Sequence, residues 1–237
     1  MRPVVRGDHP KDENGQAVIY CEYAKARREL INRMGEYCSY CEMHLDASLA
    51  VEHVQSKKPA GTVIIRRELD WYNFLLACTN CNSIKGDKDV VLSDYLWPDS
   101  DNTFFALKYS EGGLVSPADC LHDELRTLAL NTIDLTGLDK TPLNDPKASD
   151  RRLINRRETW DIAERSKQHL QCCDTPHMRT QIVFTAQAKG YWSVWMTVFK
   201  DDADMLQRFI QAFTGTCKEC FDPDNGYAPT ARVCGKC

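Results

Sequence analysis

The sequence predicts an α+β protein with zinc modules at two places and a mainly helical C-terminal half. Three observations predict this class. Eight of the twelve cysteines form Cys-x-x-Cys pairs at 38–41, 78–81, 217–220 and 234–237, which is the spacing of metal knuckles. Short apolar segments suited to strands lie between the first two pairs. Good helix formers dominate the second half of the chain.

The N-terminal part predicts one helix, one short strand and a further apolar segment. Apolar residues recur at roughly helical spacing up to Gly35, a helix stop; they are Val18, Ile19, Tyr23, Leu30, Ile31 and Met34. Leu49–His53 is typical of a short strand, and Trp71–Leu76 is an apolar segment that leads into the second knuckle. Residues 57–69 contain Pro59 and Gly61 and predict a loop.

The second half predicts helices. Residues 90–141 have mixed signals and predict a connector with some strand. Asp145 is a candidate N-cap with Pro146 at the first helical position, and this helix is expected to reach about Gln171. Further helices are expected at about 180–199 and 202–213. We therefore divide the chain into three parts: residues 1–95, a connector and helical region at 96–214, and a zinc module at 215–237.

The overall charge excludes a general attraction to nucleic acid. The formal net charge is −4, so any contact with a phosphate backbone must come from a local basic surface, a bound cation or a partner. The N-terminal segment is polar and lacks the apolar stretch of a secretory signal, and no run reaches the length of a membrane span. We expect a cytoplasmic protein.

The two cysteine sets predict two zinc sites. Four thiolates from two knuckles match the tetrahedral coordination of Zn²⁺. The first set is Cys38, Cys41, Cys78 and Cys81, and the second is Cys217, Cys220, Cys234 and Cys237. The spacing of the first set is equally typical of a module that only stabilises a fold. The second set predicts a small zinc ribbon with a structural role.

Polar residues between the first two knuckles add a catalytic pattern. Glu52 and His53 end the expected strand, Asn73 precedes the second knuckle, and Asn82 and Lys85 follow it. With the cysteines, this pattern resembles the HNH nuclease family from about residue 37 to 88. The resemblance implies a ββα-metal nuclease unit braced by structural zinc. His44 is the rival candidate for a metal or catalytic role, although a solvent-facing loop histidine is the simpler interpretation.

The resemblance also implies roles for these residues. Glu52 and Asn82 would hold a divalent cation, Mg²⁺ or Mn²⁺, through oxygen atoms. His53 would be the general base. Asn73 would hold the loop and orient His53, and Lys85 would steady a phosphate. The chain has Glu52 where the family commonly has Asp and Asn82 where it commonly has His, and both replacements keep an oxygen ligand.

A second resemblance extends along most of the chain. The segments YCSYCE, LAVEHVQSK, WYNFLLACTNCNSIKG and DPKASDRRLINRRETWDIA are similar to the PtuB family, the HNH subunits of Septu anti-phage systems. This similarity implies an ATPase partner of the PtuA type and degradation of nucleic acid, with DNA as the expected substrate, during phage infection. Two alternatives stay open: a non-catalytic zinc adaptor that docks an ATPase on nucleic acid, and a restriction-type nuclease that works alone.

Paired arginines suggest a local basic surface. Arg151, Arg152, Arg156 and Arg157 lie on an expected helix. A run of this kind is usually a solvated helix face. If the run lies beside Lys57, Lys58, Arg66 and Arg67, the eight side chains would form a phosphate track next to the metal site.

Overall fold

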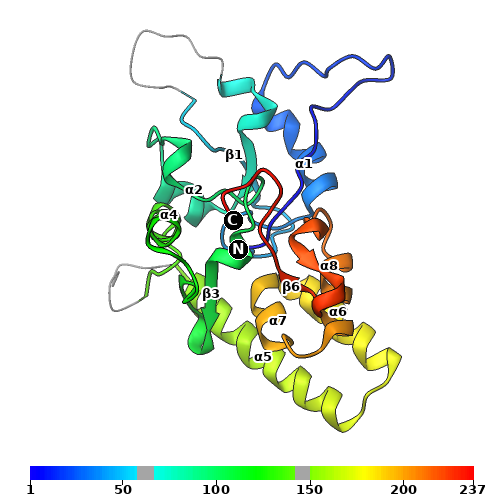
Figure 1. Cartoon of the computed structure of the whole chain (residues 1–237). Coiled ribbons are helices and arrows are strands. Elements are labelled where there is room, and N and C mark those ends of the chain that lie inside the picture. Colours follow the sequence, from blue (N-terminus) through cyan, green and yellow to red (C-terminus); the bar gives the residue numbers. More distant parts are fainter. Residues whose placement is uncertain (58–66, 142–149) are drawn as a thin grey trace.

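The computed structural model describes residues 1–57, 67–141 and 150–237 (Figure 1). The N-terminal arm contains a bridge between Lys11 and Ala17, and a 3₁₀ turn at Tyr23–Ala26 leads into α1 (Arg27–Met34). The predicted helix therefore begins later than Val18. Gly35 ends α1 with a φ of 77°, a conformation that glycine adopts at low energetic cost.

The predicted strand pairs with a second strand, which forms within the apolar segment before the second knuckle. Strand β1 (Ala50–His53) pairs with β2 (Phe74–Ala77), and Glu52 lies opposite Leu75. Two 3₁₀ turns, Arg67–Leu69 and Trp71–Asn73, precede β2. Helix α2 (Thr79–Lys85) follows β2 directly and completes a ββα unit, with Cys78 as its N-cap.

The region from 90 to 141 differs from the predicted connector. It contains a 3₁₀ turn (Leu92–Asp94), α3 (Thr103–Ala106), the hairpin of β3 (Leu107–Ser110) and β4 (Leu114–Pro117), and the 14-residue helix α4 (Asp123–Thr136). The prediction missed helix α4. His122 caps its N-terminus, and Gly137 ends it in the left-handed conformation.

The C-terminal half is helical, as predicted, with one break that was not. It contains α5 (Arg152–Cys172), α6 (Pro176–Lys189), α7 (Trp192–Val198) and α8 (Ala203–Ala212). The helix expected at 180–199 is two helices, because Gly190 and Tyr191 both have positive φ. A Cβ on Gly190 would lie 2.6 Å from the Glu42 carbonyl oxygen, so the first knuckle requires glycine there. The expected helix start at Asp145 and Pro146 lies outside the described residues.

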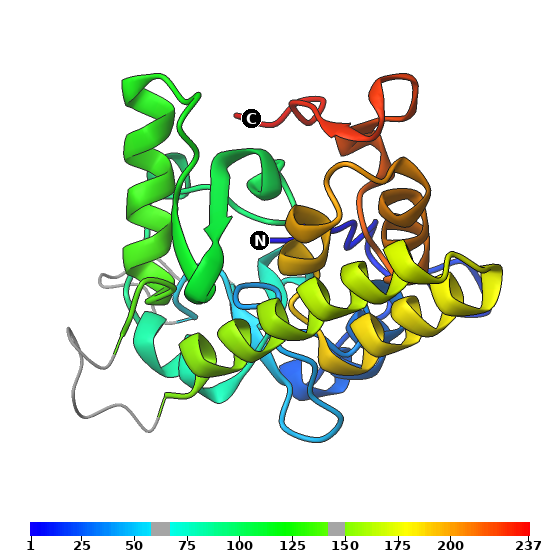
Figure 2. The ribbon, with the colours of Figure 1, turned by 90° about the horizontal axis from the view of Figure 1, so that it is seen from below.

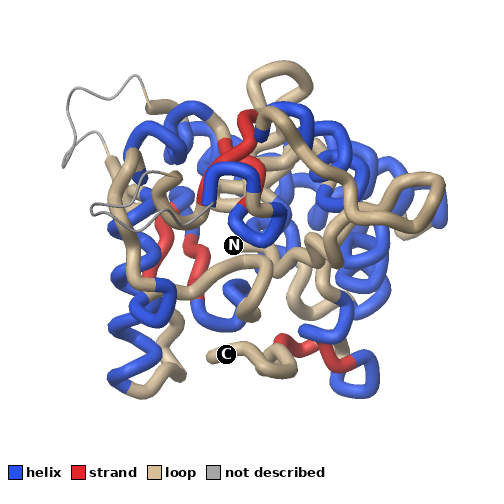
Figure 3. Tube along the Cα trace, turned by 90° about the horizontal axis from the view of Figure 1, so that it is seen from above, coloured by secondary structure: helices blue, strands red, loops and turns tan. Residues whose placement is uncertain are grey.

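Within the described residues, the strands form three separate two-stranded sheets. Figure 3 shows the pairs β1–β2, β3–β4 and the short β5 (Phe221–Asp222) with β6 (Ala228–Pro229) at different places in the molecule. Figure 2 shows α5 and α6 side by side along one side, with the C-terminal segment on the opposite side. No helix in the described ranges is both long and apolar enough to cross a membrane.

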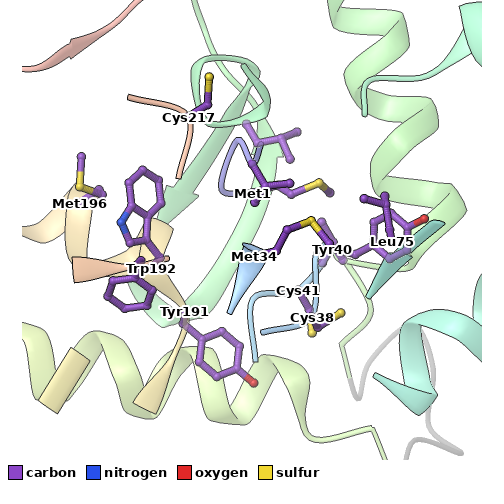
Figure 4. Packing of buried hydrophobic residues seen from close by; sticks show 14 of the residues in the cluster. Met1, Met34, Cys38, Tyr40, Cys41, Leu75, Tyr191, Trp192, Met196 and Cys217 are labelled. Carbon is purple, nitrogen blue, oxygen red and sulfur yellow. The ribbon is translucent and has the colours of Figure 1, made fainter. Parts of the chain in front are cut away.

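One hydrophobic cluster extends through all three predicted parts of the chain. Figure 4 shows some of its members, including Met1, Met34 and the knuckle residues Cys38 and Cys41. Met1 is fully buried, and its amino group lies 2.5 Å from the Tyr109 hydroxyl and 3.8 Å from the Glu42 carboxylate. The zinc-knuckle region therefore packs into the common core.

Candidate nuclease site

The first four cysteines meet in one buried cluster. The sulfur atoms of Cys38, Cys41, Cys78 and Cys81 all lie within 4.8 Å of one another, and each residue is at most 2% exposed. A tetrahedral Zn²⁺ with Zn–S bonds of about 2.3 Å separates its sulfurs by about 3.8 Å. Cys41 Sγ and Cys78 Sγ lie 3.7 Å apart. The donor set therefore fits a structural zinc ion.

Backbone contacts hold the two knuckles together. The Ser39 amide donates to the Leu76 carbonyl at 2.7 Å, and the Leu76 amide donates to Ser39 Oγ at 3.3 Å. The Cys81 amide donates to Cys78 Sγ. Hydrogen bonds from the neighbouring thiols hold the pKa of Cys78 well below its ordinary value, whereas burial raises the pKa of Cys41 and Cys81. The four thiols therefore need a cation to ionise together.

A buried arginine completes this cluster. Arg152 is 2% exposed and donates to Cys81 Sγ at 3.0 Å, to the carbonyls of Thr136 and Gly137, and to the Asp150 carboxylate. Its guanidinium places positive charge beside the thiolates and satisfies two carbonyls at the end of α4. Arg152 thus connects the zinc cluster, α4 and α5.

The phosphate track predicted from the paired arginines is wrong for two of its members. Arg156 is 1% exposed and donates to the carbonyls of Gly113 and Leu138. Both Arg152 and Arg156 point into the protein, because their donors satisfy carbonyls at turns after β3 and α4. Arg151, the N-cap of α5, and Arg157 within it are exposed. Lys58 and Arg66 lie outside the described residues.

Glu52, His53 and Asn82 line one small cavity. Its volume is about 140 Å³, and Tyr23, Lys57 and Asp87 also lie on its wall. Strand β1 supplies Glu52 and His53, and α2 supplies Asn82 (Figure 1). The ββα unit therefore brings together three of the predicted site residues.

The contacts of His53 define its tautomer. The His53 Nε2 atom lies 3.0 Å from the Glu68 carbonyl oxygen. Since a carbonyl can only accept, Nε2 carries the proton and Nδ1 keeps a lone pair. The ring packs edge-on against Tyr23 and Phe74, with centroids 4.9 and 5.3 Å away. Burial lowers the pKa of His53 below its ordinary value, which favours the neutral imidazole.

Asn73 joins the two ends of the loop that follows β1. Its Nδ2 donates to the carbonyls of Gln55 and Arg67, each at 3.0 Å, and its Oδ1 accepts from the Gln55 amide at 2.8 Å. Arg67 directly precedes Glu68, whose carbonyl accepts from His53. The Asn73 side chain is therefore well placed to fix the position of the His53 ring through the backbone.

Lys85 lies in a different place from the one expected. Its Nζ is 2.9 Å from Glu52 Oε1 and donates to the His53 carbonyl at 2.7 Å, and the side chain is 1% exposed. A side chain buried to this degree does not reach a substrate phosphate from solvent. Burial raises the pKa of Glu52, and Lys85 opposes this shift. Lys85 thus connects α2 to the end of β1 through its contacts with Glu52 and the His53 carbonyl.

Two further predicted sites differ from this one. His44 lies 3.8 Å from Glu36, packs against Tyr37 and does not line the cavity.

In the second cysteine set, Cys217, Cys220 and Cys237 are buried, whereas Cys234 is exposed with a φ of 64°. Among the described residues, the first set is the only group of His, Cys, Asp or Glu side chains that lie close enough together to hold a metal ion.

One family model matches the part of the chain that contains both knuckles and the ββα unit. Residues 38–88 match the family model of HNH endonucleases. The matched range contains both zinc knuckles and all five residues that we selected for catalysis. It supports a nuclease, which is a phosphodiester hydrolase, and nucleic acid as its binding partner. No curated protein matches the chain.

The sequence pattern missed residues outside the HNH range. Tyr23 contacts the His53 ring and the Lys57 ammonium, whose Nζ lies 4.8 Å from the Tyr23 ring centroid. Arg152 lies more than sixty positions after the second knuckle. Its position two residues after Asp150 was the available signal for an ion pair with that carboxylate. Its contacts with Cys81, Thr136 and Gly137 come only from the tertiary structure.

Proposed function

We propose that the chain is a metal-dependent HNH endonuclease that hydrolyses phosphodiester bonds of nucleic acid, with DNA as the substrate. The observation that carries this proposal is the shared cavity of Glu52, His53 and Asn82 inside the HNH range. Carboxylate and amide oxygens suit Mg²⁺ or Mn²⁺, so Glu52 and Asn82 would hold the cation. When bound, the cation would stabilise negative charge on the leaving 3′ oxygen.

The residues of the chain would supply the base. Nδ1 of His53 has a lone pair, because Nε2 donates to the Glu68 carbonyl. It can take a proton from a water molecule that attacks the phosphorus atom. Asn73 would keep the imidazole aimed at that water through the loop contacts, and Lys85 would position Glu52 and the His53 backbone.

We further propose that the nuclease works with an ATPase in anti-phage defence. This rests on the resemblance to the PtuB family and on the net charge of −4, which leaves recruitment to nucleic acid to a partner or a local surface.

We also propose a second zinc ion at Cys217, Cys220, Cys234 and Cys237. Cys234 would have to turn inward to bind it.

One observation favours a non-catalytic adaptor as the second candidate. Glu52 is 2% exposed and already pairs with Lys85. If the ammonium group holds this carboxylate permanently, it occupies the position that a catalytic cation needs. A zinc module of this kind would dock a partner on nucleic acid without cutting it.

Cleavage assays with two histidine variants separate these functions. We expect Mg²⁺- or Mn²⁺-dependent cutting of plasmid or single-stranded DNA, tested with and without a co-purifying ATPase. His53→Ala should lower the rate by roughly 100-fold or more, as loss of a general base does. His44→Ala is the matched control and should keep full activity. Zinc content should stay unchanged in both. Equal rates for wild type and His53→Ala would contradict the proposal, and no cutting even with the partner would favour the adaptor.

A further inference from the structure

A second cavity has a volume of about 290 Å³. Val54 is on its wall and directly follows His53, the last residue of β1, which lines the proposed catalytic cavity. The other residues that matter here are Arg6, Tyr72, Trp97 and Asp99. They come from three distant segments of the chain.

The polar part of the wall is an ion pair with unused hydrogen-bonding atoms. Arg6 Nη2 lies 2.9 Å from Asp99 Oδ2, and the two side chains are 11% and 7% exposed. Asp99 Oδ1 and Arg6 Nε are buried and have no hydrogen-bond partner within the described part of the chain. Buried polar atoms are normally paired. The ion pair therefore reaches the cavity only through the small exposed parts of the two side chains.

The apolar part of the wall is aromatic. The Tyr72 ring is 55% exposed, and the Arg6 guanidinium lies 5.7 Å from its centroid. Trp97 is buried, and its indole donates to the Leu92 carbonyl. An exposed ring beside a donor and an acceptor is typical of sites where proteins stack an unpaired base and bind its edge. The Asp99 carboxylate disfavours a phosphate group in the same place.

We propose that this cavity binds one unpaired base of the nucleic acid substrate, with Tyr72 stacked on the base and the Arg6–Asp99 pair bonded to its Watson–Crick edge. A paired base has this edge occupied, so the cavity selects a single strand or a base turned out of a duplex. The base site rests on the proposed nuclease function and adds that the substrate has an unpaired base at this point.

Binding measurements on the full chain test this site. His53→Ala serves as the background, so that the strand stays intact, and the probe is a fluorescently labelled single strand followed by anisotropy. Adding Tyr72→Ala should weaken binding about 5- to 150-fold, the effect of removing a base-stacking ring. Phe184→Ala is the matched control: Phe184 is 58% exposed on α6 and does not line the cavity. It should leave affinity unchanged.

An abasic scan gives an independent readout. Replacing each base of the probe in turn by an abasic site should weaken binding at one position near the cleavage point, and Tyr72→Ala should remove this position dependence. Equal affinities for the Tyr72 and Phe184 variants, or no sensitive position, would overturn the base site while wild-type cleavage still supports the nuclease. Absence of both binding and cleavage in the wild type would overturn the nuclease and the base site together.

Discussion

The two four-cysteine sets have the same Cys-x-x-Cys spacing and different surroundings. In the first set, the β1–β2 pair and two Ser39–Leu76 hydrogen bonds bring both knuckles together, and the sulfurs lie within 4.8 Å of one another. In the second set, the strands are two residues long and Cys234 faces outward. The Cys-x-x-Cys spacing alone thus predicts that the cysteines bind zinc. Paired strands bring the four sulfur atoms together.

The largest expected difference between the sets is in stability. Cys78→Ser should remove the first zinc ion and most of the folding free energy, because structural zinc contributes about 10–16 kcal/mol in small finger peptides and domains are stable by only about 5–15 kcal/mol. Cys234→Ser should lower the free energy of unfolding far less, since Cys234 is exposed. Denaturant unfolding and zinc content check this. A Cys78→Ser protein that unfolds at the wild-type midpoint would contradict the comparison.

Arg152 also distinguishes the first cysteine set from the second. Replacing it should lower stability less than Cys78→Ser does. It donates to Cys81 Sγ, whereas Arg232, beside the second set, donates to the carbonyls of Val4 and Pro98. Arg152→Ala leaves a buried thiolate and two carbonyls without a donor, and should lower the free energy of unfolding by about 3–5 kcal/mol. Its exposed neighbour is the control, and Arg151→Ala should change stability by less than about 0.5 kcal/mol. Equal effects of the two variants would show that Arg152 does not brace the cluster.

The smallest expected effect is on the pH dependence of DNA cleavage. It depends on His53, near the first cysteine set, and not on the second set. Burial lowers the pKa of His53 from 6.5, and the base works only when neutral. Activity should therefore persist below pH 6.5 and fall as pH drops through the folded-state pKa. The pH profile of kcat/KM for DNA cleavage measures this. Cys234→Ser should give the same profile, and an acidic midpoint above 6.5 would contradict the assignment of His53.

Some elements were predictable because their signals are local. The strand that ends at Glu52 and His53 is present as β1. Helix α8 begins and ends close to the predicted residues. The expected helix at 180–199 was wrong because a contact with Glu42, about 150 positions away, imposes positive φ at Gly190 and Tyr191. Helix α4 was missed because its cap, His122, is an uncommon N-cap residue.

By itself, the sequence determined the chemistry that depends on residue type and short spacing. Thiol pairs three positions apart indicate zinc. Glu52 and His53 between the knuckles, with Asn82 directly after the second one, indicate an HNH nuclease unit. Only the tertiary structure decided which charges are buried. Lys85 meets Glu52, Arg152 meets Cys81, and Arg6 meets Asp99 across 33, 71 and 93 positions of the chain. A buried charge requires a partner, and partners at these distances are chosen by packing rather than by local sequence.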